Sequence, residues 1–214
     1  EELPLHGRLS FLPAKQVVAE GNWEGDDYII TVRGKVREAI PFGTHLELTR
    51  EISMALGEKS FRIHDRIENC DVNRSPLMYV YHCNPGFPVL DEGTRLAIAS
   101  EKTIEWVDER EVGADTYTTA VAPMEKMHDD VYVHQVKADA EGNANVGLIN
   151  DTLGLGLRWT FPRDEIPIVT QWQHFHRGTY VTGIEPGNAS MLGRASNRRH
   201  GTLQYIEPEE IRDF

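Results

Sequence analysis

The sequence predicts an all-β fold, built as a large antiparallel sandwich. Apolar and polar residues alternate in segment after segment, turn-forming residues separate these segments, and no long stretch has the apolar stripe of a helix. Alternation of this kind is typical of half-buried strands in antiparallel sheets. Because many such strands follow one another within 214 residues, we predict one large domain over residues 1–214 rather than two small ones.

Six segments carry the alternation most clearly. In the second of them, Leu46 and Leu48 share one face while Glu47 and Thr49 share the other. The six predicted strands span residues 27–36, 44–56, 60–70, 131–139, 153–161 and 179–185.

Turn chemistry separates the predicted strands, because glycine, asparagine and aspartate tolerate the backbone angles of tight turns. These turns are predicted at residues 24–27, 56–59, 141–143 and 150–151. Residues 100–127 are more polar than the rest, so we predict an insertion or a long loop there.

The composition limits the partners and the location. A net charge of −12 argues against nucleic acid and anionic membrane surfaces as main partners. No apolar run is long enough to span a membrane, and the start lacks the pattern of a signal peptide. Cys70 and Cys83 are predicted to be free thiols in a reducing compartment, so we expect a cytoplasmic protein.

His82 ends an apolar, strand-like segment. In "SPLMYVYHCN", Met78, Val80 and His82 share one face, and the turn signal Asn84-Pro85-Gly86 follows. The imidazole has an unperturbed pKa of roughly 6.5, which suits proton transfer at physiological pH. The alternative is a histidine whose hydrogen bonds are satisfied by the following turn.

Glu185 ends a second apolar segment. In "TYVTGIEPGN", Val181, Gly183 and Glu185 alternate onto one face before Pro186. Partial burial by that strand would raise the pKa of the carboxyl, as a general base requires. The alternative is a solvated turn residue.

A third candidate segment is "QWQHFHRG", which places Trp172, His174 and His176 on one face. This row suits a sugar-binding platform, a pair of metal ligands or an ordinary surface. Asp129, just before a predicted strand, is either a cap or a site residue.

The order of these motifs resembles the aldose 1-epimerase (galactose mutarotase-like) superfamily, and within it a DUF4432-like bacterial branch. The resemblance extends over most of the chain, and its strongest anchors are the succession Arg50, Asn69, His82 and the Glu185 motif. The segments that carry it are "LPLHGRLSFLPA", "LELTREI", "FRIHDRIENCDVNRSPLMYVYHCNPGFP", "HDDVYVHQV" and "YVTGIEPGNAS".

The resemblance implies a β-supersandwich with a sugar cleft on a concave face. His82 takes the position of the general acid and Glu185 that of the general base, on opposite sides of one sugar ring. Asp129 fits a pattern in which it is followed by the aromatic Tyr132. The residues expected to bind the sugar are His6, Arg8, Asp129, Trp172 and His176.

The chain departs from the family pattern in two ways. An upstream arginine and an N-terminal part of the sheet are not visible before Glu1, so we expect either an N-terminally truncated domain or a branch that builds the cleft differently. His82 is followed by "CNPGFP" instead of an aromatic residue, so the resemblance does not define the sugar specificity, while the acid role of His82 is less affected.

The sequence thus predicts an enzyme that interconverts anomers of a monosaccharide without metal or other cofactor. Exposed sheet edges lead us to expect a homodimer as one form of the protein. Two alternatives remain: a metal-dependent sugar isomerase using His174, His176 and Glu185, and a non-catalytic carbohydrate-binding module.

Overall fold

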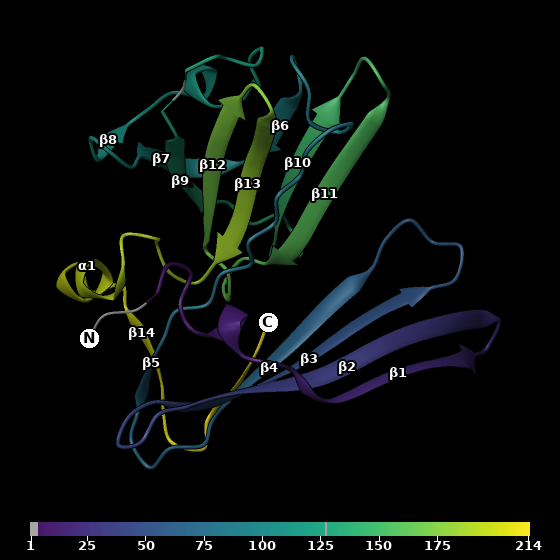
Figure 1. Cartoon of the computed structure of the whole chain (residues 1–214), viewed down its shortest axis with the longest axis vertical. Helices are drawn as coiled ribbons and strands as arrows, with labels where there is room; N and C mark the ends of the chain where they lie inside the picture. The colour runs from purple at the N-terminus through teal and green to yellow at the C-terminus, as the bar shows by residue number, and fades with distance from the viewer. Residues whose placement is uncertain (1–3, 127) are drawn as a thin grey trace. The chain divides into compact units, whose positions relative to one another are not determined.

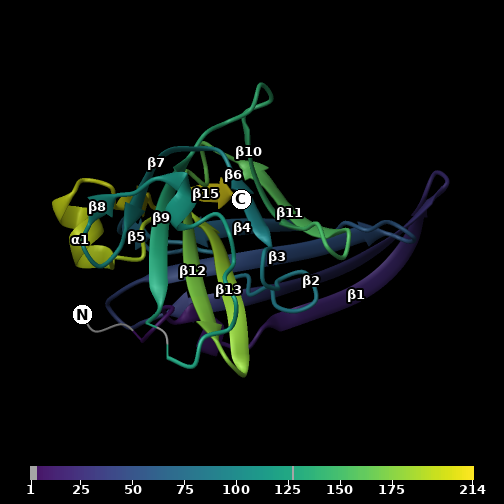
Figure 2. The same cartoon turned by 90° about the horizontal axis from the view of Figure 1, so that it is seen from above.

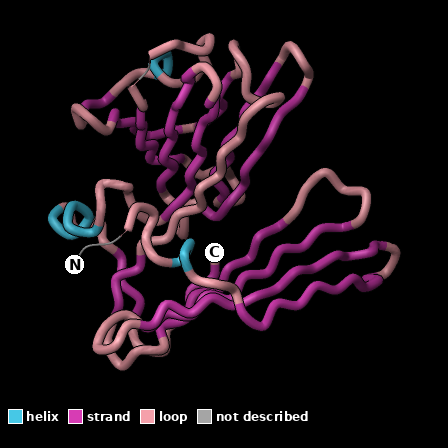
Figure 3. The backbone as a smooth tube through the Cα atoms, in the orientation of Figure 1, coloured by secondary structure: helices cyan, strands magenta, loops and turns pink. Residues whose placement is uncertain are grey.

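The computed structural model describes residues 4–126 and 128–214, and strands dominate its backbone (Figure 3). The all-β prediction is confirmed. The helical segments of the described chain are three short ones: η1 (Leu9–Phe11), η2 (Ala114–Thr116) and α1 (Arg194–Arg199). None of the helices in the described ranges is long and apolar enough to cross a membrane.

The chain forms two compact units. The first unit comprises Glu1–Leu77 and Tyr205–Phe214, and the second comprises Met78–Gln204. The single domain expected over residues 1–214 stays a prediction.

The first unit is built on a five-stranded antiparallel sheet (Figure 1). One end of its apolar face is buried, with Leu48 and Ile67 each less than 7% exposed, whereas Trp23 near the first hairpin is 71% exposed. The strands of this sheet, in spatial order, are β1 (Lys15–Glu24), β2 (Asp27–Ala39), β3 (His45–Ala55), β4 (Arg62–Asn69) and β15 (Ile211–Asp213). A separate short pair is formed by β5 (Ser75–Leu77) and β14 (Gln204–Ile206).

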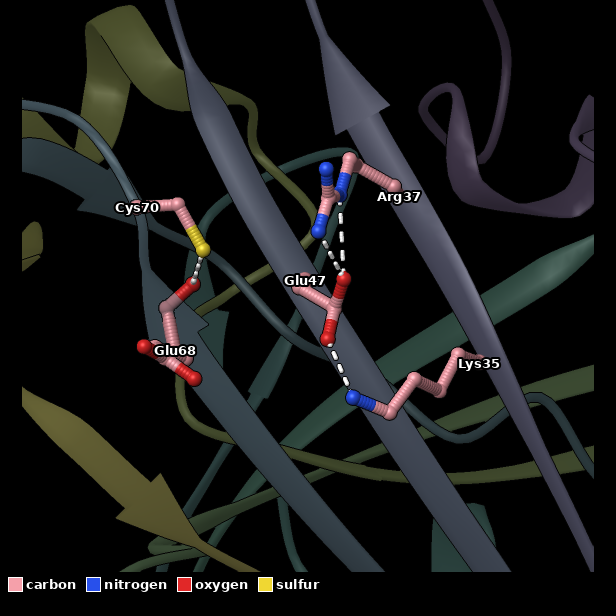
Figure 4. Close-up of polar contacts among 5 residues, drawn as sticks. All are labelled: Lys35, Arg37, Glu47, Glu68 and Cys70. Carbon is pink, nitrogen blue, oxygen red and sulfur yellow. Dashed lines mark hydrogen bonds and ion pairs between the residues drawn. The ribbon is translucent and has the colours of Figure 1, made fainter. Parts of the chain in front are cut away.

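The opposite face of this sheet is charged (Figure 4). Glu47 accepts hydrogen bonds from Lys35 Nζ at 2.6 Å and from Arg37 Nε at 2.9 Å, and these two partners lower the pKa of its carboxyl. Cys70 lies beside them with its Sγ 4.0 Å from the carbonyl oxygen of Glu68. Neither Cys70 nor Cys83 forms a disulfide within the described part of the chain, in keeping with the prediction of thiols.

The second unit contains two antiparallel sheets (Figures 1 and 2). Their inner faces meet in a core of mixed polarity, where Leu96 and Leu148 of one sheet and Phe175 and Gln173 of the other line the same small cavity. The larger sheet has the order β13 (Thr179–Gly187), β12 (Ile168–His176), β9 (Asp130–Val136), β7 (Ser100–Glu105) and β8 (Arg110–Glu111). The smaller sheet has the order β11 (Leu155–Pro162), β10 (Asn143–Asn150) and β6 (Arg95–Ile98).

A histidine sits in this core with both ring nitrogens bonded. His134 is fully buried, with Nδ1 3.0 Å from Thr103 Oγ1 and Nε2 3.1 Å from Gln171 Oε1. Burial lowers the pKa of His134 to about 4, so the ring is neutral at physiological pH. It is therefore a structural histidine on the inner face of the sheet.

The prediction of an insertion or long loop over residues 100–127 is wrong for residues 100–105. Ser100–Glu105 forms β7, which lies between β9 and β8 in the larger sheet. Its buried inward contact is the polar Thr103, which bonds to His134. Because this core contact is polar, the apolar alternation that reveals other strands is absent here.

Candidate active site

The chain around His82 runs along the free edge of β13. Two bridges, Val80 with Gly187 and Cys83 with Ile184, share one antiparallel register, which places His82 opposite Glu185. Regular strand structure ends earlier than the motif suggested, since β5 stops at Leu77. Backbone hydrogen bonds hold the edge in place: Tyr81 N to Pro186 O at 2.8 Å, Cys83 N to Ile184 O at 3.3 Å, and Ile184 N to Cys83 O at 2.8 Å.

His82 and Glu185 form a close pair. The distance from His82 Nε2 to Glu185 Oε1 is 3.2 Å, and the side chains are 29% and 2% exposed. The two residues were expected on opposite sides of a sugar ring, but the structure places them in direct contact. The direct contact leaves no room for a ring between the two side chains as they lie in this structure.

The environment of Glu185 suits a general base. Its second oxygen, Oε2, is buried and has no hydrogen-bond partner within the described part of the chain. Burial raises the pKa of Glu185 to about 7. The carboxyl therefore gains and loses its proton near neutral pH, and one of its oxygens lacks a donor.

The neighbouring strand adds a row of rings on the same face of the sheet. Trp172 pairs with Gly183, and Thr170 pairs with Glu185, across β12 and β13. The Trp172 ring lies 6.5 Å from the His82 ring, measured between centroids, in an edge-to-face arrangement. The row continues through His174, 5.4 Å from Trp172, to His176, 6.1 Å further on.

A family model of DUF4432, a domain of unknown function, matches residues 1–214. The chain belongs to the DUF4432 family. A search of curated proteins finds no match.

Solved structures show the fold class of this DUF4432 protein. A "putative aldose 1-epimerase" from Klebsiella pneumoniae superposes with a TM-score of 0.91 at 26% identity, covering 98% of this chain and 55% of that one. A galactose mutarotase related enzyme from Lactobacillus acidophilus gives 0.64 at 12% identity, covering 99% and 72%. A galactose mutarotase-like protein from Clostridium acetobutylicum gives 0.53 at 12% identity, covering 92% and 64%. The resemblance and the galactose mutarotase-like fold are thus confirmed, and this chain spans about half the length of the Klebsiella protein.

The structure of the DUF4432 protein brings together five of the seven predicted site residues. His82, Glu185, Trp172, His176 and Asp129 are connected through ring contacts and hydrogen bonds that run by way of His174. Their catalytic and sugar-binding roles stay predictions.

Asp129 contacts the row of rings rather than Tyr132. Its Oδ1 lies 2.5 Å from His174 Nδ1, while His174 Nε2 lies 2.9 Å from Thr179 Oγ1. Tyr132 is buried on the other face of the sheet, paired with Gln171, so it does not share the face on which Asp129 contacts His174.

The remaining two predicted residues, His6 and Arg8, belong to the first unit. Arg8 donates a hydrogen bond from Nε to Glu38 Oε1 at 2.9 Å. His6 has a positive φ of 67° in the loop before η1. Their part in sugar binding stays a prediction.

The donor geometry does not favour the metal-site alternative. Across residues 4–126 and 128–214, no three side chains of His, Cys, Asp or Glu are grouped so that they could hold a metal ion. Both nitrogens of His174 are engaged by Asp129 and Thr179, and Glu185 contacts His82 instead of His176.

Sequence reasoning assigned no site role to Thr170, Thr179 or Gly183. Gly183 lies beside the Glu185 carboxyl, Thr170 is paired with Glu185 across β12 and β13, and Thr179 contacts His174. The signal for Gly183 was present, because it shares the alternating face that leads to Glu185.

Proposed function

We propose that this DUF4432 protein interconverts the α and β anomers of an aldose by general acid–base catalysis. The observation that carries the proposal is the His82–Glu185 pair, an imidazole 3.2 Å from a buried carboxyl with a raised pKa. The likeness to structures named for aldose 1-epimerase and galactose mutarotase supports a sugar-related role.

The chemistry requires two proton transfers. A base removes the proton of the anomeric hydroxyl, and an acid protonates the ring oxygen, so that the C1–O5 bond breaks. The C1–C2 bond then rotates, and the steps reverse to close the other anomer. Each positioned proton transfer contributes roughly 10² to 10⁴-fold, so two groups suffice for a reaction that is already facile.

Glu185 is the proposed base. With a pKa of about 7, part of the population is ionised at neutral pH, and the conjugate acid is weak enough to return the proton. Because the Glu185 side chain is 2% exposed, a sugar hydroxyl would reach the carboxyl once the imidazole of His82 moves aside.

His82 is the proposed acid. Its side chain is 29% exposed, so it can turn from Glu185 toward a ring oxygen when the sugar enters. Trp172 packs edge-on against the same imidazole and limits where it can turn.

Sugar binding is assigned to the residues around this pair. Asp129 is 52% exposed and held by His174, so its carboxylate is accessible to a hydroxyl group. Trp172 and His176 extend the surface along β12. A sugar-binding role for His6 and Arg8 is carried by the family resemblance alone. The proposed partner is a monosaccharide and not nucleic acid, in keeping with the net charge of −12.

Polarimetry on freshly dissolved α-D-galactose, α-D-glucose and a panel of other aldoses tests the proposal. We expect acceleration of at least one sugar, and a loss of about 10²-fold or more in kcat for Glu185→Gln and for His82→Ala. His64→Ala is the matched control, because His64 forms a similar pair with Asp213 at 3.1 Å in the first unit. Full activity in either site variant, or no acceleration of any sugar, contradicts the proposal.

The same samples distinguish a non-catalytic carbohydrate-binding module from an enzyme. Calorimetric binding of a sugar whose mutarotation is not accelerated would favour the module over the enzyme.

A further inference from the structure

We propose that Gly183 is the positioning residue of this site, because its missing side chain provides the slot in which the Glu185 carboxyl lies against His82. The structural part of this inference stands on geometry alone, and its catalytic part rests on the proposed function.

The slot is defined by distances from a Cβ atom built on Gly183. That atom would lie 2.4 Å from Glu185 Oε1, 3.3 Å from Glu185 Cδ and 3.2 Å from Trp172 Cβ. Cβ atoms in proteins essentially never approach another heavy atom closer than 3.0 Å. The oxygen that contacts His82 therefore occupies the space that any other residue at position 183 would fill.

Gly183 is not required by its own backbone. Its φ lies outside the positive range that favours glycine, so alanine can adopt the same conformation. The effect of a side chain at position 183 is steric, and it acts on the carboxyl group two residues further along the same face.

If position 183 carries a Cβ atom, the Glu185 carboxyl is the group that must move. Trp172 Cβ is fixed to the backbone of β12, which is paired with β13 directly opposite Gly183. The Glu185 side chain can rotate, and rotation would take Oε1 away from His82 Nε2 and carry the carboxyl out of its buried position. Exposure to water would then return the pKa of Glu185 toward that of an ordinary glutamate.

The test compares Gly183→Ala with the matched control Gly147→Ala. Gly147 lies in β10 of the same unit, and a Cβ there would meet its nearest atoms at ordinary distances of 3.7 and 3.8 Å. In Gly183→Ala we expect the pKa of Glu185, followed by ¹³C NMR of labelled glutamate and assigned with Glu185→Gln, to fall by about one unit or more. We expect kcat for mutarotation to fall about tenfold or more, with a smaller change in KM. Gly147→Ala should change neither.

A double-mutant cycle on thermal unfolding covers the case in which Gly183→Ala folds poorly. If the added methyl group clashes with the Glu185 carboxyl, Gly183→Ala should lower Tm in the wild-type background and have little effect in a Glu185→Ala background. Equal losses of Tm in both backgrounds, or an unchanged Glu185 titration in Gly183→Ala, would overturn the inference. If wild type accelerates no sugar, the proposed function fails, while the titration and the cycle still decide the role of Gly183.

Discussion

Glu185 combines deep burial with only partial hydrogen bonding. Its Oε1 contacts His82, and its Oε2 has no partner in the described chain, so the ionised form lacks the donors that usually stabilise a buried carboxylate. A protein optimised for stability alone would place an apolar side chain here. A buried carboxyl with a raised pKa beside a partly exposed histidine is the pattern expected of a functional group.

This burial makes stability depend on pH in a direction opposite to that of most carboxyl groups. The folded-state pKa of about 7 exceeds the ordinary glutamate value of 4.5, so the folded state binds the proton more tightly than the unfolded state does. The resulting stability is fully present below about pH 4.5 and is lost as the pH rises through 7.

Glu185→Gln should therefore gain stability relative to wild type as the pH rises from 5 to 8. The gain should reach up to roughly 3 kcal/mol, at 1.36 kcal/mol per pKa unit. Urea unfolding of both proteins at the two pH values measures it. A difference between variant and wild type that is the same at pH 5 and pH 8 would show that Glu185 titrates normally.

At the scale of elements, the end of β13 holds the segment that carries His82. A Cβ on Gly187 would lie 2.7 Å from Val80 Cγ2 and 2.8 Å from the carbonyl oxygen of Tyr79, so glycine allows this close approach. Asn188 then bonds Tyr79 on two sides: its Oδ1 accepts from Tyr79 N at 2.7 Å, and its backbone N donates to Tyr79 O at 3.0 Å. These contacts set the register that places His82 opposite Glu185.

Asn188→Ala removes the side-chain half of this attachment. Because the Tyr79 amide is then left buried without that acceptor, we expect a loss of about 1–3 kcal/mol in the free energy of unfolding. We also expect kcat to fall, since His82 loses its fixed position. Unfolding in urea and polarimetry check both effects, and Asn145→Ala, which removes an exposed amide in β10, is the control. Wild-type activity in Asn188→Ala would mean that the segment is positioned by other contacts.

The alternation of apolar and polar residues located six of the strands and missed others, among them β10, whose residues alternate in burial. β2, β3, β4, β9, β11 and β13 each overlap a predicted segment. β1 was missed because all ten of its residues are exposed, which removes the alternation. β7 was missed because its buried contact is a threonine.

For the site, alternation identified His82 and Glu185 as strand-end residues, and the family resemblance joined them. Alternation cannot give the pairing between distant segments, so the direct contact at 3.2 Å was not foreseen. The spacing of Asp129 and Tyr132 does not place them together, because residues three apart on an extended chain point to opposite faces. The Asp129–His174 contact depends on the pairing of β9 with β12, which no local pattern contains.

At the scale of the whole molecule, the single-domain prediction is tested by cooperativity. The chain leaves the first unit after Leu77 and returns at Tyr205, so neither unit is a simple N- or C-terminal half. We expect one calorimetric transition. Leu48→Ala in the first unit and Leu148→Ala in the second should each move this transition to lower temperature, and each should lower the free energy of unfolding by about 2–5 kcal/mol. Two transitions, each moved by only one of these variants, would define two domains.

The central claim, that Glu185 and His82 act together as base and acid on a sugar, is tested most directly by the pH dependence of mutarotation. We predict that kcat/KM of wild type rises with pH along a limb centred near pH 7, the pKa of the buried Glu185 carboxyl, and that this limb is absent in Glu185→Gln. A wild-type rate that is flat from pH 5 to 9, or an identical profile in Glu185→Gln, would contradict the claim.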